Sequence, residues 1–190
     1  MSDNKIRCPW CTKSQLEMDY HDQEWGTPLH DDDKLFEFIV LDSFQAGLSW
    51  KTILNKRENF RKAFAGFDAK KIAKFDAAKV EKLMLDAGII RNRLKIEGTV
   101  KNAKAFLATQ KEFGTFDKYI WQFTGGKTIN HKLGNHYQPI VSSPESDAMS
   151  KDLKKRGFTF VGTTICYAFM QAAGMVNDHM TSCHRYKQLA

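Results

Sequence analysis

The fold class that the sequence predicts is all-α, and three observations predict it. Apolar residues recur three and four positions apart along most of the 190-residue chain, which is the period of a helix that buries one face. Residues that cap helix N-termini precede several of these stretches. No segment shows the clear apolar and polar alternation of a half-buried strand. With 42% hydrophobic residues, the chain can bury a core and fold as one domain.

Two helices are predicted in the first third of the chain. The acidic residues 31–33 suit the positive end of a helix, and the apolar residues after them have helical spacing, namely Leu35, Phe36, Ile39 and Val40. Ser49 can cap a second helix, because its hydroxyl can accept a hydrogen bond from a backbone amide of the first turn. The inward face of this second helix would contain Trp50, Ile53, Leu54, Phe60 and Phe64.

The middle of the chain predicts two more helices and a long connection. Asp76 opens a helix that stops at Gly88 and buries Val80, Leu83 and Met84. The next helix tolerates Gly98 at some cost in helix propensity, and its apolar face contains Ile96, Val100, Ala103, Phe106 and Leu107. Residues 124–143 have no period and many turn formers, so we expect a long surface connection there.

Two helices complete the predicted fold. Pro144 follows Ser143 as a first-turn residue follows its cap, and the cations and glycine of residues 154–157 suit the negative C-terminal end of the same helix. The last long helix is predicted from about Thr163 to Gly174.

Charge and hydropathy narrow the class of protein. The net charge of +7 and the pI near 9.2 favour a polyanionic partner, and nucleic acid is the first to test, although a merely soluble basic protein stays an alternative. No run of 18 apolar residues occurs, and the first eight residues are polar, so we expect neither a membrane span nor a secretory signal. In the cytosol that this predicts, cysteines are thiols or metal ligands rather than disulfides.

Two pairs of potential metal ligands lie near opposite ends of the chain, Cys8 with His21 and His179 with Cys183. Together they form the Cys2His2 set of a closed, structural zinc site. The spacing of four in the second pair would suit one face of a helix. Chance placement stays open, as does competition from Cys11 or His184. A redox role for the Cys8–Cys11 pair is disfavoured because no βαβ pattern surrounds it, and Cys166 fits a buried core position.

Long motifs of this chain resemble those of one known family. They are YHDQEWG at residues 20–26, LDSFQAGLSW at 41–50, KKRGFTFVGTTICYAFMQAAG at 154–174 and VNDHMTSC from Val176. Together they resemble the 3-methyladenine DNA glycosylase I family of base-excision repair, a divergent branch of the helix-hairpin-helix glycosylases. The resemblance implies one structural zinc ion held by Cys8, His21, His179 and Cys183. It also implies one domain over residues 1–190, with a helical core at about 31–175 and zinc-linked ends at 1–30 and 176–190.

By this resemblance, the base pocket is aromatic and contains one carboxylate. Trp50 would stack on a flipped cationic base, and Trp10 and Tyr20 would complete the walls, although ordinary core packing is the alternative for each. The family has a glutamate where this chain has Asp42, which shortens the reach of the carboxylate by about 1.5 Å. The family has an aromatic residue where this chain has Glu17, which either supplies the missing carboxylate or lies on the surface.

DNA contacts are expected at two turns. Gly47 allows a close approach, and Leu48 could wedge into the gap left by the extruded nucleotide or pack inward. The second turn resembles the hairpin of a helix-hairpin-helix motif and contains Gly162, Thr163 and Thr164, whose amides would bind a phosphate. Residues 86–93 form a similar turn and are a weaker candidate.

The resulting hypothesis is a cytosolic, monomeric glycosylase that releases 3-methyladenine from alkylated double-stranded DNA without cleaving the strand. Asp42 would be its catalytic carboxylate, with no water-activating base assigned. Two alternatives rest on Asp42 and Glu17. One is a damaged-DNA-binding protein that has lost efficient catalysis, and the other is a glycosylase of shifted specificity.

Overall fold

The computed structural model describes residues 4–134 and 138–189, and the predicted all-α class is confirmed over them. The α-helices are α1 (Gln15–Gln23), α2 (Asp32–Gln45), α3 (Trp50–Ala63), α4 (Ala69–Ile72), α5 (Ala77–Met84), α6 (Arg93–Phe113), α7 (Phe116–Ile120), α8 (Pro144–Lys155), α9 (Thr163–Ala172) and α10 (Tyr186–Leu189). Short 3-10 turns are η1 (Pro9–Cys11), η2 (Ala65–Phe67) and η3 (Trp121–Thr124).

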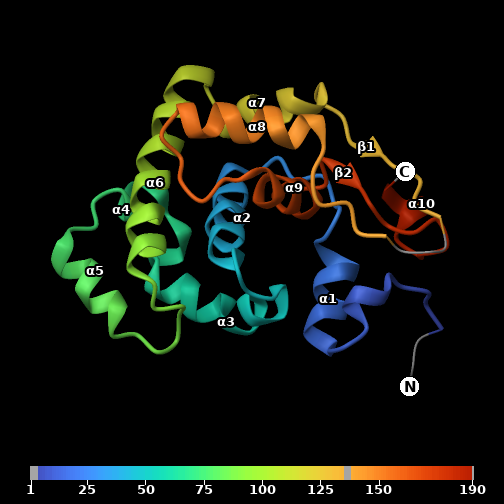
Figure 1. The fold of residues 1–190 in the computed structure, drawn as a ribbon, viewed down its shortest axis with the longest axis horizontal. Helices are drawn as coiled ribbons and strands as arrows, with labels where there is room; N and C mark the ends of the chain where they lie inside the picture. Colours follow the sequence, from blue (N-terminus) through green and yellow to red (C-terminus); the bar gives the residue numbers. More distant parts are fainter. Residues whose placement is uncertain (1–3, 135–137, 190) are drawn as a thin grey trace.

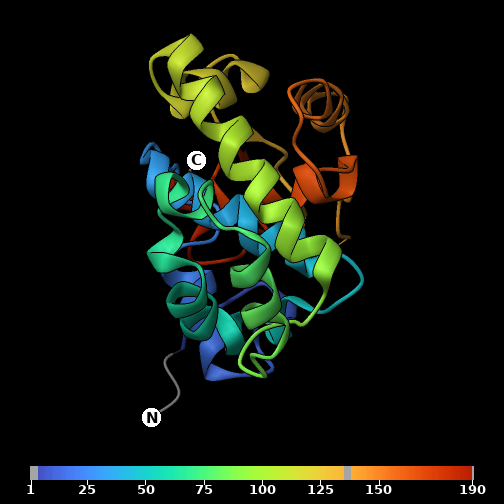
Figure 2. The same ribbon diagram turned by 90° about the vertical axis from the view of Figure 1, so that its left-hand side faces the viewer.

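Helix α2 forms the centre of the molecule. All ten residues from Leu35 to Phe44 are buried, which is typical of a helix enclosed on every side rather than on one face. Its neighbours are α3, α6, α7 and α9, as the middle of Figure 1 shows, and α6 crosses one side of the molecule diagonally in Figure 2. Asp42 lies near the end of α2, so a carboxyl group is placed inside the most enclosed helix of the fold.

The predicted helix starts are confirmed with their capping atoms. At four predicted helix starts a side-chain oxygen accepts the backbone amide three residues later, in the pairs Asp31 with Lys34, Ser49 with Thr52, Asp76 with Lys79 and Ser143 with Ser146. Each such cap typically contributes about 1 kcal/mol. The local sequence therefore determines where these helices begin.

Some boundaries and elements differ from the prediction. Helix α5 ends at Met84 rather than Gly88, and α1 and α7 had no predicted counterpart. The predicted end near Gly174 is close to the end of α9 at Ala172. Gly174 has φ +68°, and a Cβ there would lie 2.3 Å from the carbonyl carbon of Thr27. This glycine therefore allows the chain after α9 to pack against the loop after α1.

A small parallel pair of strands corrects the prediction that no strand exists. β1 (Ile129–Asn130) pairs with β2 (Val176–Asn177). Each strand has two residues, which is too few to show an alternation of apolar and polar residues in the sequence. β1 lies in the predicted long connection, of which residues 135–137 are outside the described residues. The pairing fixes this connection against the segment that leads to His179 (Figure 1).

No helix in the described ranges combines the length and the apolar character that crossing a bilayer requires.

Candidate functional site

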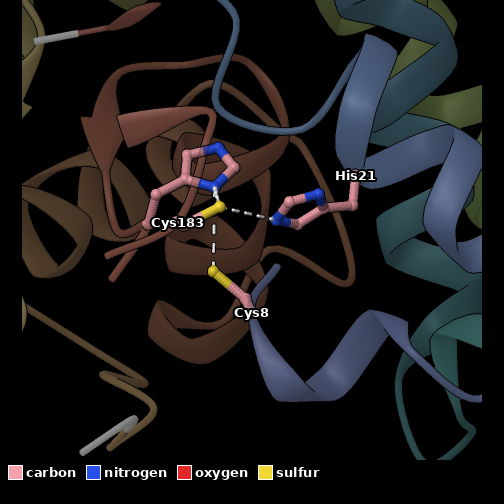
Figure 3. Close-up of side chains that lie close together, drawn as sticks. Cys8, His21 and Cys183 are labelled. Atoms are coloured by element: carbon pink, nitrogen blue, oxygen red, sulfur yellow. Dashed lines mark hydrogen bonds between the residues drawn. The ribbon is translucent and has the colours of Figure 1, made fainter. Parts of the chain in front are cut away.

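Four side chains from the two ends of the chain form a buried cluster. Cys8, His21, His179 and Cys183 are all buried, and their ligand atoms lie within 4.8 Å of one another. The Sγ atom of Cys183 is 3.5 Å from Nε2 of His21 and 3.6 Å from Nδ1 of His179, and the Sγ atom of Cys8 is 3.7 Å from the same Nδ1 (Figure 3). A tetrahedral zinc ion would separate such atoms by about 3.3–3.8 Å. The cluster could therefore hold a metal ion of this size.

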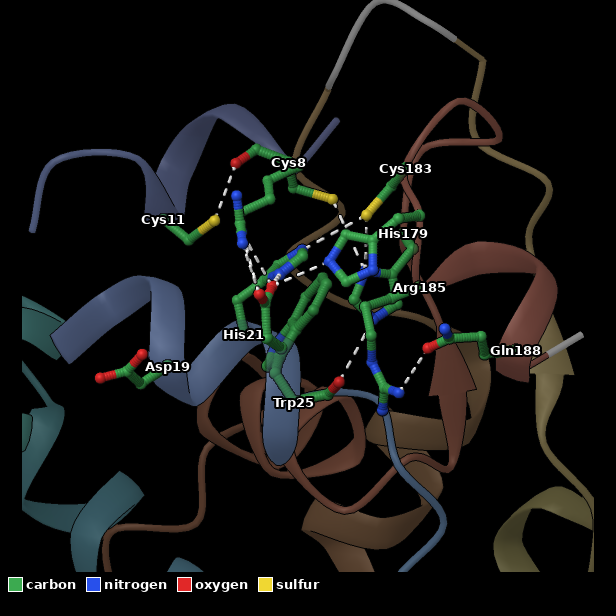
Figure 4. A network of polar contacts seen from close by, with 12 residues as sticks. Cys8, Cys11, Asp19, His21, Trp25, His179, Cys183, Arg185 and Gln188 are labelled. Atoms are coloured by element: carbon green, nitrogen blue, oxygen red, sulfur yellow. Dashed lines mark hydrogen bonds and ion pairs between the residues drawn. The ribbon is translucent and has the colours of Figure 1, made fainter. Parts of the chain in front are cut away.

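The ring nitrogens that face away from the cluster are also engaged. Nδ1 of His21 lies 2.8 Å from Asp22, and Nε2 of His179 lies 3.2 Å from the carbonyl oxygen of Trp25. Such outer partners fix the tautomer and the orientation of metal-binding histidines. Desolvation alone would raise the pKa of Asp22, but hydrogen bonds from Arg7, His21 and then His184 hold it well below its usual range. Figure 4 shows His21, Trp25 and His179 within this polar network.

The two alternative ligands lie next to the cluster but have other contacts. The Cys11 thiol donates to the carbonyl oxygen of Cys8 at 3.1 Å, and His184 lies 3.0 Å from Asp22. His184 forms a second potential metal group with His21 and Asp22, which shares one residue with the first. The expected helical placement of His179 and Cys183 is wrong, because they lie in the turns that follow β2. Turns bring both side chains inward without a helix face.

A second feature beside the cluster is a cavity of about 130 Å³. Its walls come from η1, α1 with the turn after it, α2, α3 and α9, and the lining residues are Trp10, Tyr20, Trp25, Asp42, Gln45, Trp50, Ala168 and Gln171. Trp10, Tyr20, Asp42 and Trp50, which were proposed as pocket residues, therefore lie together. Tyr20 and Trp50 have ring centroids 5.2 Å apart, and those of Trp10 and Trp25 are 5.1 Å apart.

Four of the lining residues were not predicted from the sequence, namely Trp25, Gln45, Ala168 and Gln171. Trp25 lies in the same motif as Tyr20, and Gln45 lies in the same motif as Asp42, so both motifs could have indicated them. Gln171 lies in the motif at residues 154–174, but a glutamine on an apolar helix is not tied to any chemistry by its spacing.

The cavity concentrates polar atoms that lack partners. Within residues 4–134 and 138–189, the fully buried side-chain nitrogen and oxygen atoms without a hydrogen bond are Trp10 Nε1, Asp42 Oδ2, Trp50 Nε1 and Arg185 Nε. The first three belong to residues that line this cavity. Buried polar groups are normally paired, and an unpaired one costs about 1–3 kcal/mol. Two donors and one acceptor, all on residues that line the cavity, therefore lack a partner within the described part of the protein.

The electrostatic state of Asp42 depends on its burial. The residue is 2% exposed, and no ion pair to it exists among the described residues. Burial raises the pKa of Asp42 well above its usual range, and burial followed by the nearby Asp42 raises that of Tyr20. Burial therefore favours the neutral carboxyl group, and a cationic ligand in the cavity would favour the ionised form.

The structure does not bring Glu17 into the cavity. Its side chain is buried beside the start of α1, where Oε2 accepts a hydrogen bond from the Ser14 hydroxyl at 2.7 Å. The expectation that it supplies a second carboxylate is therefore not supported by the geometry, and Asp42 is the acidic residue that lines the cavity.

The turn between α2 and α3 presents the predicted wedge to solvent. Gly47 has φ +79°, and Leu48 is 41% exposed rather than packed inward. The buried Lys95 of α6 donates to the carbonyl oxygens of Phe44 at 2.8 Å and Ala46 at 2.6 Å. Lys95 thus satisfies carbonyl groups at the end of α2 and holds the turn in place.

The residues of the predicted hairpin lie between α8 and α9 and in the first turn of α9. Gly162 is the N-cap of α9 with φ −63°, so its role does not depend on a positive φ, and no side chain caps the helix. Thr164 is exposed, and the Thr163 hydroxyl lies 2.8 Å from that of Ser146. Arg156 is paired with Glu112 and Asp152, which leaves the exposed Lys154 and Lys155 as the nearby cations in sequence.

Comparison with known proteins identifies the family. A model of methyladenine glycosylases matches residues 10–186, nearly the whole chain. The chain belongs to the methyladenine glycosylase family. A family relative from Haemophilus influenzae, named DNA-3-methyladenine glycosylase, is 49% identical over 177 residues, which cover 93% of this chain and 96% of the relative. DNA-3-methyladenine glycosylase 1 of Escherichia coli is 48% identical over 180 residues, which cover 95% of this chain and 96% of the relative.

Solved structures of the methyladenine glycosylase family agree with this result. A tyrosine-to-phenylalanine variant of 3-methyladenine DNA glycosylase I, in complex with 3-methyladenine, matches with a TM-score of 0.91 at 34% identity. The match covers 94% of this chain and 96% of that one. The family resemblance expected from the motifs is confirmed.

Proposed function

We propose that this protein is a DNA-3-methyladenine glycosylase, a hydrolase that removes 3-methyladenine from alkylated DNA. The observation that carries the proposal is the aromatic cavity with three unpartnered polar atoms, on Trp10, Asp42 and Trp50. Support comes from the names of the relatives and from the neighbour that binds 3-methyladenine. The relatives are named as glycosylases, which does not favour the alternative of a damaged-DNA-binding protein without efficient catalysis.

The chemistry requires recognition more than strong acid catalysis. An adenine alkylated at N3 carries positive charge in DNA, so the bond from its N9 to C1′ of the sugar breaks readily and the base leaves neutral while water adds to C1′. The base must first leave the stack, at a cost of a few kcal/mol that is smallest for a damaged base. The aromatic walls then favour the flipped cation, since base stacking contributes about 1–3 kcal/mol.

Each polar group of the cavity has a complementary role. Asp42 would accept a hydrogen bond from the exocyclic amine and favour the positive charge in its ionised form. The indole N–H group of Trp10 would donate to a ring nitrogen of the base, while Trp50 would stack on its face. Among the described residues no lysine lines the cavity to act as a nucleophile, so we expect a monofunctional enzyme that leaves an intact strand with an abasic site.

We propose that Cys8, His21, His179 and Cys183 hold one zinc ion. Four protein ligands leave no open coordination position, so the metal would join the two ends of the chain and take no part in the reaction. The distances between the sulfur and nitrogen atoms support this assignment.

Two surfaces would bind double-stranded DNA. Leu48, exposed beside Gly47, would fill the gap left by the flipped base. Gly162, Thr163 and Thr164 would offer the uncapped start of α9 to a phosphate, as in a helix-hairpin-helix motif. The net charge of +7 supports binding to a polyanion. A single domain over residues 1–190 that acts as a cytosolic monomer completes the proposal.

The direct test is an excision assay. A duplex that contains a single 3-methyladenine should lose this base on incubation with the purified protein, and release no faster than the spontaneous rate would reject the enzymatic function. Asp42→Glu separates the alternatives. Loss of excision would indicate a pocket built around aspartate, whereas a large gain with unchanged DNA affinity would favour the weakened, DNA-binding alternative.

A further inference from the structure

Gln171 of α9 lines the base cavity and is held at both its backbone and its side chain. Its backbone carbonyl oxygen accepts a hydrogen bond from the amide of Gly26 at 2.9 Å. Its side-chain Nε2 donates to Oδ2 of Asp178 at 2.8 Å. The glutamine is therefore a fixed part of the cavity wall rather than a mobile side chain.

Asp178 determines which end of the Gln171 amide faces the cavity. The aspartate is 1% exposed, and every hydrogen-bonding group around it can donate, since Oδ2 also accepts from the Tyr167 hydroxyl at 2.8 Å and Oδ1 lies 2.6 Å from Nδ1 of His131. A carboxylate can only accept hydrogen bonds, so the NH2 end of the amide must face Asp178. The carbonyl end must point away from it.

The carbonyl oxygen of Gln171 is available to a ligand. Among the described residues it has no hydrogen-bond partner, and it is not one of the fully buried unpaired atoms. It therefore remains accessible, on a residue whose other polar end is committed to Asp178. A base in the cavity would therefore face a hydrogen-bond acceptor on an amide group that cannot flip.

The discrimination that Asp42 can supply depends on whether its carboxyl group is ionised. In the neutral form that burial favours, a carboxyl group can donate through its hydroxyl or accept through its carbonyl oxygen. It can therefore match either an exocyclic amine or an exocyclic carbonyl group. The fixed carbonyl group of Gln171 matches only the amine, which adenine-type bases carry and guanine-type bases replace with a carbonyl oxygen.

We propose that Gln171, oriented by Asp178, is a specificity-determining residue that accepts a hydrogen bond from the exocyclic amine of an N3-alkylated adenine and rejects the corresponding guanine. The inference rests on the proposed glycosylase function and adds to it the choice between the two purines. Opposed carbonyl oxygens would leave two acceptors unpaired, which corresponds to discrimination of about tenfold or more.

The test measures the release of two bases from one substrate. Duplex DNA that carries both N3-methyladenine and N3-methylguanine is incubated with each protein, and kcat/KM for the two released bases is determined by chromatography. Gln171→Met keeps the length of the side chain and removes the carbonyl group, so the preference for adenine should fall about tenfold. An unchanged preference in this folded variant would overturn the inference.

Asp178→Asn gives a sharper outcome. An asparagine amide can donate to the Gln171 carbonyl oxygen, which would turn the Gln171 NH2 group toward the cavity and shift the preference toward guanine. Tyr167→Phe is the matched control, because it removes a hydrogen bond to the same Asp178 oxygen and leaves Gln171 oriented. The preference of Tyr167→Phe for adenine over guanine should equal that of the wild type. An equal fall of this preference in Tyr167→Phe and Asp178→Asn would indicate a purely structural role for Asp178 and would overturn the inference.

Different results would reject the proposed function and the inference about Gln171. If the wild-type protein releases no 3-methyladenine, the proposed function fails. If it releases this base and Gln171→Met keeps its preference, only the specificity inference fails. Asp178 precedes His179, so Asp178→Asn is compared only if its circular dichroism spectrum matches that of the wild type. Gln171→Met otherwise decides, with calorimetric titration of free 3-methyladenine and 3-methylguanine as the second readout.

Discussion

The Cys/His cluster and the aromatic cavity are neighbours with opposite polar arrangements. In the cluster, each histidine has one ring nitrogen near a cysteine and the other near an oxygen of Asp22 or Trp25. In the cavity, Asp42 Oδ2 and two indole nitrogens have no partner. Because unpaired buried polar atoms are costly, they persist where a ligand completes them. The difference separates a scaffold site from a recognition site.

The two regions share a wall. Trp25 lines the cavity, its ring lies 4.6 Å from that of His179 between centroids, and its carbonyl oxygen lies 3.2 Å from Nε2 of that histidine. Trp10 is 5.6 Å from His21 by the same measure and also lines the cavity. The cluster therefore supports the rings that would hold the base, and the predictions below separate this support from recognition itself.

The largest effect on stability is expected when a ligand of the Cys/His cluster is removed. Cys8→Ser or His179→Ala should lower thermal stability strongly, since structural zinc contributes about 10–16 kcal/mol of apparent binding free energy in zinc-finger peptides. Cys11→Ala is the matched control, because this buried thiol lies beside the cluster but outside the four ligands, and its loss should be much smaller. Thermal unfolding and metal analysis provide the measurements. Less than one zinc equivalent in folded, carefully purified protein would contradict the assignment.

Removing a cavity ring should impair recognition more than folding. Trp50→Ala should weaken binding of free 3-methyladenine by about 1–3 kcal/mol, because one stacking face is lost. Calorimetric titration measures this change. Trp121, whose indole donates to the Leu29 carbonyl oxygen away from the cavity, gives the comparison in Trp121→Phe. Equal loss of base affinity in both variants would refute a direct role for Trp50.

The Asp42 carboxyl group should make stability depend on pH. Burial raises its pKa in the folded protein, so the folded state binds more protons than the unfolded state above the usual aspartate range, and stability is lost as the pH rises. Asp42→Asn removes this titration and should be more stable than the wild type at neutral pH, but not at acidic pH, while binding the cationic base less tightly. Denaturant unfolding at the two pH values tests this. A variant that is less stable at neutral pH would contradict it.

The smallest effect on stability is expected at the exposed wedge. Leu48→Ala should change the free energy of unfolding by no more than about 0.5 kcal/mol, because the side chain is 41% exposed. It should nevertheless slow excision from duplex DNA and leave affinity for the free base unchanged. Leu85→Ala, at an 82% exposed leucine elsewhere, should leave both unchanged. Normal excision by Leu48→Ala would reject the wedge.

Local signals explain what could be predicted of the fold. Asp31, Ser49 and Asp76 cap helices through atoms within three residues, so their positions could be predicted from sequence alone. The β1 and β2 pair could not, because two residues carry no periodicity and their partners lie about fifty residues apart along the chain. The helical placement of His179 and Cys183 was wrong because a spacing of four also occurs across turns.

The site could be predicted less completely than the helices, because it depends on how segments far apart in the sequence pack together. Trp10, Tyr20, Asp42 and Trp50 were indicated by the family resemblance, and their meeting in one cavity depends on how η1, α1, α2 and α3 pack. Gln171 lies in a family motif but was not singled out, since its proposed importance depends on Asp178, seven residues later, holding its amide in one orientation. Glu17 was expected in the pocket, but its local hydrogen bond with Ser14 places it elsewhere.

The central claim is that the cavity binds a methylated purine between aromatic rings, with Asp42 as its polar partner. A crystal structure of the protein with free 3-methyladenine tests it most directly. The account predicts the base against Trp50, with its exocyclic amine within hydrogen-bond distance of Asp42. A cavity filled by protein side chains, with Trp50 turned away and the base absent or bound elsewhere, would contradict it.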